Sequence, residues 1–168
     1  DLKGLTINKV QAGFEEHGLA LIYQPDHFPL ADTLNNYREE LGKRPPLASM
    51  ELIWTSHLGE HLLVSGFVHP PTEDRAQEVI KILGEKELIS IKGLEGGTDL
   101  PLSRSSITGV MKRDQFKRII LHSKDHNLSG DDIKWTNLED WSKYAYEALN
   151  NQGPLQKALI WNAGIYLW

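Results

Sequence analysis

The chain has 168 residues, a net charge of −5 and no cysteine. This length allows one domain with a hydrophobic core, and the 40% hydrophobic and 24% charged residues are typical of a globular protein. The absence of cysteine excludes disulfides and thiolate zinc sites. No apolar run approaches the roughly 20 residues of a membrane span. The net negative charge argues against a protein that binds the phosphate backbone of nucleic acids. We therefore expect neither a membrane nor a nucleic acid as a partner, and we expect the protein to be cytoplasmic.

Both ends of the sequence resemble cut ends. No initiator Met precedes Asp1, and the apolar residues 158–168 run to the last position without a polar cap or a glycine stop. We therefore expect residues 1–168 to be a fragment or an excised domain of a longer chain.

The first part of the chain is predicted to hold two helices around a buried strand. Thr6 is placed to cap a helix that Gly18 ends. The apolar residues 19–23 predict a buried strand, which Pro25 would end. A second helix is expected over 30–41, where leucines and a tyrosine recur every three or four residues before Gly42 and Pro45 end it.

The middle of the chain is predicted to form sheet. Apolar runs indicate strands at 51–55, 62–68 and 88–91, and a helix from Pro70 to Gly84 separates the last two. A strand, a helix and a strand within about 30 residues form a βαβ unit, whose two strands are parallel. The pattern predicts the α/β class, with a central and mostly parallel sheet flanked by helices.

The last part of the chain is predicted to add two strands and two helices. The strands are expected at 107–111 and 118–121. Thr136 and Glu139 have the spacing of a capping box at the start of a helix. The final helix is expected to begin at Gly153-Pro154, because proline suits the first helical position.

The loop that follows the strand at 88–91 is the strongest site candidate on physical grounds. It reads Lys92-Gly93-Leu94-Glu95-Gly96-Gly97-Thr98-Asp99. Open α/β sheets bind ligands beyond the carboxyl ends of their strands, and this loop leaves such an end. Its glycines let a ligand approach the backbone, and its carboxylates are ligands that Mg²⁺ prefers. The alternative is a tight surface loop with solvated acids.

Three separated stretches of the chain match the motifs of one known family in order. The first comprises Leu5-Thr6 at the start of a helix, then residues 18–29, and then Tyr37-Arg38-Glu39-Glu40-Leu41-Gly42-Lys43-Arg44. The second is 91–100, and the third is Asn162-Ala163-Gly164-Ile165-Tyr166-Leu167. Together they resemble the anthranilate phosphoribosyltransferase family. The resemblance implies that residues 1–168 are one α/β domain, phosphoribosyltransferase-like and catalytic, which forms the C-terminal part of a longer chain. The helical N-terminal domain and the glycine-rich pyrophosphate loop lie upstream in the family and have no match in this sequence.

The resemblance also implies a reaction and its ligands. The family transfers ribose 5-phosphate from phosphoribosyl pyrophosphate to an aromatic amine such as anthranilate, with Mg²⁺, in tryptophan biosynthesis, and the full-length protein is expected to form a homodimer. Arg38 matches the family arginine that contacts the aromatic carboxylate, which a guanidinium grips with two hydrogen bonds. The alternative for Arg38 is a surface salt bridge. Lys92 and Gly93 would bind substrate, whereas the metal ligands would be Glu95, Thr98 and Asp99.

Departures from the family pattern leave other hypotheses open. Thr98 and Asp99 stand where the family has adjacent Asp and Glu, so one charged metal ligand is lost. Phe28 replaces a histidine, and residues 46–51 replace a Gly-Pro-Leu-x-Asn-Pro motif. A divergent paralogue is therefore expected, either active with another acceptor or a non-catalytic binder of an anionic ligand or nucleic acid. A pure interaction module is the third hypothesis. We expect the 168-residue chain alone to be inactive.

Overall fold

A computed structural model describes residues 3–42, 52–55, 57–113 and 115–167 of the chain. Residues 1–51 and residues 52–168 form two compact units. The expectation of one domain over residues 1–168 stays a prediction. No helix in the described part of the chain is long and apolar enough to span a membrane.

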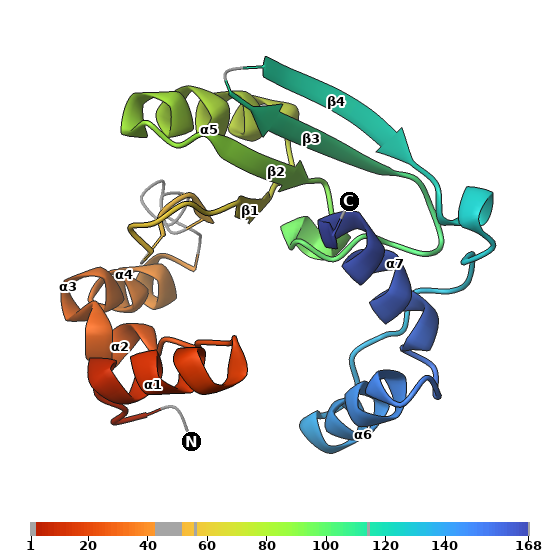
Figure 1. Cartoon of the computed structure of the whole chain (residues 1–168), viewed down its shortest axis with the longest axis horizontal. Helices are drawn as coiled ribbons and strands as arrows, with labels where there is room; N and C mark the ends of the chain where they lie inside the picture. Colours follow the sequence, from red (N-terminus) through yellow and green to blue (C-terminus); the bar gives the residue numbers. More distant parts are fainter. Residues whose placement is uncertain (1–2, 43–51, 56, 114, 168) are drawn as a thin grey trace. The chain divides into compact units, whose positions relative to one another are not determined.

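The regular secondary structure in the described part of the first unit is helical (Figure 1). The helices are α1 (Ile7–His17), α2 (Gln24–His27), α3 (Pro29–Asp32) and α4 (Leu34–Leu41). Gly18 and Gly42 end α1 and α4 with left-handed backbone angles, φ 68° and 59°, as the sequence predicts. Thr6 is the N-cap of α1, although its side chain makes no capping hydrogen bond.

Two predictions for the first unit are wrong. Residues 19–23 form no strand, and Leu19 and Leu21 are 64% and 54% exposed. A strand needs a neighbour to pair its backbone groups, and the described residues of this unit offer none. The single helix expected over 30–41 is divided at Thr33, whose hydroxyl donates to the carbonyl of Leu30 at 2.6 Å. Such a local hydrogen bond competes with helical pairing.

The second unit is built on a mixed sheet with the spatial order β1-β2-β3-β4. The strands are β1 (Leu63–Gly66), β2 (Glu87–Ile91), β3 (Ser106–Lys112) and β4 (Gln115–Leu121). Helix α5 (Pro70–Leu83) joins β1 to β2, which are parallel, so the predicted βαβ unit is confirmed. Gly84 ends α5 in the left-handed conformation, with φ 79°.

The α/β class is confirmed, but the expectation of a mostly parallel sheet is wrong for the described strands. Both β2–β3 and β3–β4 are antiparallel. Lys112 pairs with Gln115, only three positions further along the chain, and strands that follow each other so closely can only be antiparallel neighbours. The β2–β3 connection likewise contains no crossover helix among its described residues, which are 92–105.

The strand predicted at 51–55 is also wrong over its described part. Residues 52–55 belong to no strand, while Glu51 lies outside the described residues. Ile53 is nevertheless buried, and it packs in one core cluster with Ile80, Leu88 and Met111. A short apolar run can bury one side chain from a turn as well as from a strand, so the run alone does not identify a strand.

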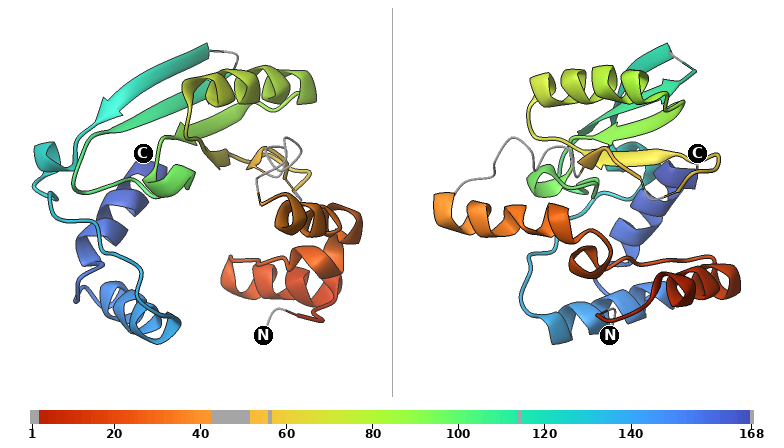
Figure 2. Two further views of the ribbon diagram at one scale, coloured as in Figure 1. Left: turned by 180° about the vertical axis from the view of Figure 1, so that it is seen from behind. Right: turned by 90° about the vertical axis from the view of Figure 1, so that its left-hand side faces the viewer.

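The sheet buries different side chains on its two faces. Leu88 packs on the side of α5. Its neighbour Ile89, together with Ile91, packs in a second cluster with Trp161. Trp161 lies in α7 (Gln156–Leu167), which follows α6 (Leu138–Leu149), and Figure 2 shows α5 and α7 in relation to the sheet. The N-cap of α6 is Asn137, one residue after the predicted Thr136.

Candidate functional site

The glycine-rich loop, residues 92–99, lies at the carboxyl ends of the parallel strands β1 and β2. It leaves β2 after Ile91 and contains the short 3₁₀ turn η2 (Leu94–Gly96). A Cβ atom added to Gly66, the last residue of β1, would lie 2.3 Å from the carbonyl oxygen of Gly96 and 2.6 Å from that of Gly97. The loop therefore passes directly over the end of β1, and only glycine at position 66 leaves room for it.

The loop is closed by its own backbone hydrogen bonds. The N–H of Leu94 donates to the carbonyl of Asp99 at 2.9 Å, and the N–H of Gly97 donates to the carbonyl of Leu94 at 2.8 Å. Glu95 has the left-handed φ of 51°, which a non-glycine residue seldom adopts. A Cβ atom on Gly93 would lie 2.3 Å from the carbonyl oxygen of Gly97, so glycine at position 93 is required by the packing of the loop itself.

The two carboxylates of the loop are open to solvent. Glu95 and Asp99 are exposed, and Thr98 between them in sequence is half-buried. Burial raises the pKa of Tyr166 above its usual value, and the negative charge of Asp99 adds to this effect, so Asp99 lies within electrostatic reach of that phenol. The described residues contain no group of three or more His, Cys, Asp or Glu side chains that could hold a metal.

Helix α7 contacts the loop on either side of Asp99. The hydroxyl of Tyr166 donates to the carbonyl of Thr98. The N–H of Leu100 donates to the Oδ1 atom of Asn162 at 2.8 Å. Reasoning from the sequence singled out residues 162–167 only through the family resemblance and missed these contacts. An amide in an otherwise apolar helical segment was the available signal, because such a group needs a partner.

Two basic side chains accompany the loop. Lys92 is half-buried, and its backbone is tied to β3, since its N–H donates to the carbonyl of Ile107 at 2.9 Å. Arg104 follows the loop in sequence, and its Nη2 atom donates to the carbonyl of Gly93 at 3.4 Å. No local sequence pattern identifies Arg104, because its contact with Gly93 depends on how the chain turns back from the loop to β3.

Arg38 lies in α4, in the first unit. Its Nη1 atom donates to the Oδ1 atom of Asn35 at 3.2 Å, and Asn35 donates in turn to Asp32 at 2.6 Å. Arg38 belongs to one unit and the glycine-rich loop to the other, so its role toward an acceptor carboxylate stays a prediction. The described residues do not include Lys43, Arg44 or residues 46–51, the segment that replaces a motif of the family.

The second unit is thus an α/β fold whose glycine-and-acid loop lies at the carboxyl ends of its two parallel strands. Comparison with known proteins gives the particular resemblance: the chain is 26% identical over 168 residues to the anthranilate phosphoribosyltransferase of Leptothrix cholodnii. It is 25% identical over 165 residues to that of Burkholderia ambifaria, and 24% over 168 residues to the anthranilate phosphoribosyltransferase 1 of Ralstonia nicotianae.

These alignments cover nearly the whole chain but only part of each relative. They include 96% to 98% of the chain and 48% of each relative, so the chain spans about half the length of the curated relatives it matches. No family model matches the chain. The resemblance that the three short stretches predict is confirmed as a low-identity similarity along the chain.

Proposed function

We propose that this chain is an α/β part of a phosphoribosyltransferase-like enzyme. The full-length protein would transfer ribose 5-phosphate from phosphoribosyl pyrophosphate to an aromatic amine such as anthranilate. The observation that carries the proposal is the position of Glu95 and Asp99, which are exposed on a folded loop at the carboxyl ends of two parallel strands. Ligands bind at this edge of α/β sheets, and the similarity to anthranilate phosphoribosyltransferases supports the same reading.

The donor atoms of the loop fit Mg²⁺. This ion is usually held by one or two carboxylates, together with waters and substrate phosphates, rather than by a cage of protein ligands. The loop offers the carboxylates of Glu95 and Asp99 and the hydroxyl of Thr98, all of them oxygen donors. Bound Mg²⁺ would supply positive charge for the pyrophosphate that leaves in the reaction.

Other residues of the chain would bind and orient the substrates. Lys92 would add a positive charge for a phosphate group. Gly93 would act by letting the loop close, because a side chain there would collide with the carbonyl of Gly97. Arg38 would orient the acceptor by gripping its carboxylate. The pyrophosphate loop, the helical domain and a homodimer contact would belong to the longer protein, so the chain alone is proposed to be inactive.

The proposal is tested by titrating phosphoribosyl pyrophosphate with the chain and following its ³¹P NMR signals. We expect Mg²⁺-dependent broadening that Asp99→Asn abolishes, because the cation links the loop to the pyrophosphate. Asp131→Asn removes another exposed acid of the same unit and is the matched control. Binding that persists in Asp99→Asn would contradict the proposal. Formation of phosphoribosyl anthranilate by the chain alone would contradict its predicted inactivity.

The second candidate is a non-catalytic paralogue that binds an anionic ligand or nucleic acid. Thr98 favours it, because this residue stands where the family has a charged metal ligand and its carbonyl is already engaged by Tyr166. The same titration separates the two candidates. Phosphate binding that is independent of Mg²⁺ and insensitive to Asp99→Asn would support the paralogue.

A further inference from the structure

Two side chains of α7 hold the backbone of the glycine-rich loop immediately before and after Asp99. Tyr166 donates a hydrogen bond to the carbonyl of Thr98. Asn162 accepts from the N–H of Leu100 at 2.8 Å and donates to its carbonyl at 3.4 Å. The two residues are four apart, so they lie on one face of the helix, one turn from each other. Asp99 is the exposed residue between these two fixed points.

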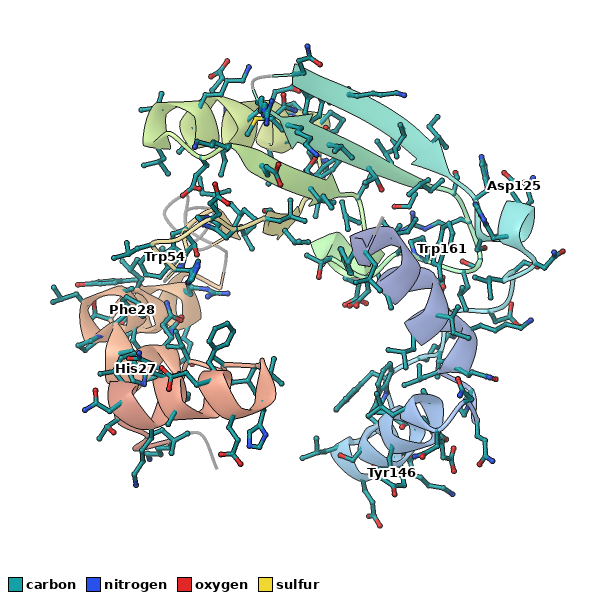
Figure 3. All side chains as sticks on the ribbon, viewed as in Figure 1. His27, Phe28, Trp54, Asp125, Tyr146 and Trp161 are labelled. Carbon is teal, nitrogen blue, oxygen red and sulfur yellow. The ribbon has the colours of Figure 1, made fainter. Side chains whose placement is uncertain are left out.

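Both the end of the glycine-rich loop and helix α7 are anchored in the hydrophobic core. Leu100 is 1% exposed and Trp161 of α7 is 3% exposed, and they belong to the same hydrophobic cluster as Ile91 of β2. Figure 3 labels Trp161 on α7. The hydrogen bonds of Asn162 and Tyr166 therefore connect the loop to a helix that is itself fixed against the sheet.

The side-chain amide of Asn162 in α7 is used for the loop rather than for solvent. Asn162 interrupts the apolar sequence of residues 158–165, where an unpaired amide would be costly to bury. Its Nδ2 atom also donates to the carbonyl of Ala158 at 2.9 Å, which fixes the orientation of the amide. The side chain is thus held by its own helix in the orientation that the backbone of Leu100 requires.

We propose that Tyr166 and Asn162 are positioning residues, which hold residues 98–100 so that the Asp99 carboxylate is presented to a divalent cation. This inference rests on the proposed function, since it assigns a role to α7 in the same site. Groups that orient a metal ligand without touching the metal typically contribute 10- to 100-fold to metal affinity. Tyr166→Phe keeps the ring and removes only the hydroxyl, so roughly tenfold weaker cation binding is expected at the low end of that range.

The test uses Mn²⁺ as a paramagnetic probe of the Mg²⁺ site in the 168-residue chain. Selective broadening of the backbone amides of Thr98 and Asp99 in NMR spectra reports binding at the loop and gives the Kd. Asp99→Asn should abolish the broadening, and Tyr166→Phe should weaken it about tenfold. Tyr146→Phe is the matched control, because Tyr146 is 71% exposed on α6 (Figure 3), and it should leave the Kd unchanged.

Asn162→Ala provides a second variant with its own readout. Hydrogen exchange of the Leu100 amide should accelerate in this variant, because the acceptor of that N–H is lost, and Mn²⁺ binding should weaken in parallel. All Kd values are compared at a temperature where circular dichroism shows every variant folded, so that unfolding does not account for a loss of binding.

The outcomes separate this inference from the proposed function. Absence of Mn²⁺ broadening at Asp99 in the wild-type chain would overturn the cation role in the proposed function, and the positioning role with it. A wild-type chain that binds Mn²⁺ at Asp99, with an equal Kd in Tyr166→Phe and Asn162→Ala, would overturn the positioning role alone. A Kd that weakens in both variants but not in Tyr146→Phe supports it.

Discussion

Glu73, in the first turn of α5, and Arg118, in β4, form an ion pair. The Nε atom of Arg118 donates to the Oε2 atom of Glu73 at 3.0 Å, and the Nη2 atom binds the same oxygen. Glu73 is only 1% exposed, and the hydroxyl of Ser90 donates to its Oε1 atom at 2.5 Å. Each carboxylate oxygen therefore has a donor, which is the condition for burying a charge beneath a helix.

Glu73→Ala is predicted to destabilise the protein. The substitution leaves the hydroxyl of the buried Ser90 without its acceptor, and a buried polar group without a partner costs about 1–3 kcal/mol. We expect a decrease of that size in the free energy of unfolding, measured by urea denaturation. Glu78→Ala, at an exposed position of the same helix, is the control and should stay within about 0.5 kcal/mol of wild type. Equal losses in the two variants would contradict a special role for Glu73.

Gly109→Ala is predicted to be destabilising for a related reason. Gly109 pairs with Ser90 on one side and with Arg118 on the other, and an added Cβ atom would lie 2.6 Å from the Oε1 atom of Glu73. It would also lie 2.5 Å from the Cζ atom of Phe116. Overpacking of this kind costs about 1–3 kcal/mol.

Gly164→Ala is the control for Gly109→Ala. Gly164 lies inside α7, and a Cβ atom there would meet nothing within 4 Å. Alanine is the better helix former, so the variant should gain about 0.5–1 kcal/mol. The two glycine substitutions should thus change the midpoint of urea denaturation in opposite directions; a loss of stability in both would show that the space around Gly109 does not decide the result.

The sequence predicts the elements whose signals are local. Pro70 and Gly84 mark the ends of α5, and its apolar spacing and the following run at 88–91 identify a helix and a strand without any long-range information. The position of the glycine-rich loop follows from the same pattern, because the carboxyl end of a strand is where the chain leaves it. The place of the loop in the fold was predictable for this reason.

The contacts that shape the site depend on residues far apart in the sequence. Asn162 and Leu100 are 62 residues apart, and Glu73 and Arg118 are 45 apart. No local pattern specifies such pairs. The strand predicted at 19–23 is wrong for a different reason. Its apolar residues satisfy the local signal of a strand, but the described part of its unit provides no strand to pair with.

The cap of α6 shows how a local signal can be displaced by one residue. Asn137 accepts a hydrogen bond from the N–H of Asp140 at 2.9 Å and donates to its carboxylate at 2.8 Å, in place of the predicted pair Thr136 and Glu139. Asn137→Ala should lower the free energy of unfolding by about 1 kcal/mol, as loss of an N-cap usually does. Thr136→Ala is the matched control and should have little effect; the reverse order in urea denaturation would favour the capping box read from the sequence.

Tyr166 is predicted to make stability depend on pH in the alkaline range. Its pKa is raised in the folded protein, chiefly by burial and further by the charge of Asp99. The unfolded chain, with a tyrosine pKa of about 10, therefore loses the phenolic proton at lower pH than the folded protein does. The contribution of the neutral phenol is complete below about pH 10 and is lost as the pH rises through the folded-state pKa.

The measurement is the difference in free energy of unfolding between wild type and Tyr166→Phe, obtained by urea denaturation from about pH 8 to pH 11. Near pH 8 the variant should be less stable by about 1 kcal/mol, because it lacks one hydrogen bond. Above about pH 10 the difference should shrink, since only wild type carries the titrating phenol. Every other ionisable group is common to the two proteins, so its contribution cancels in the difference. A gap that stays constant or widens with pH would show that the phenol is not held in its neutral form against the loop.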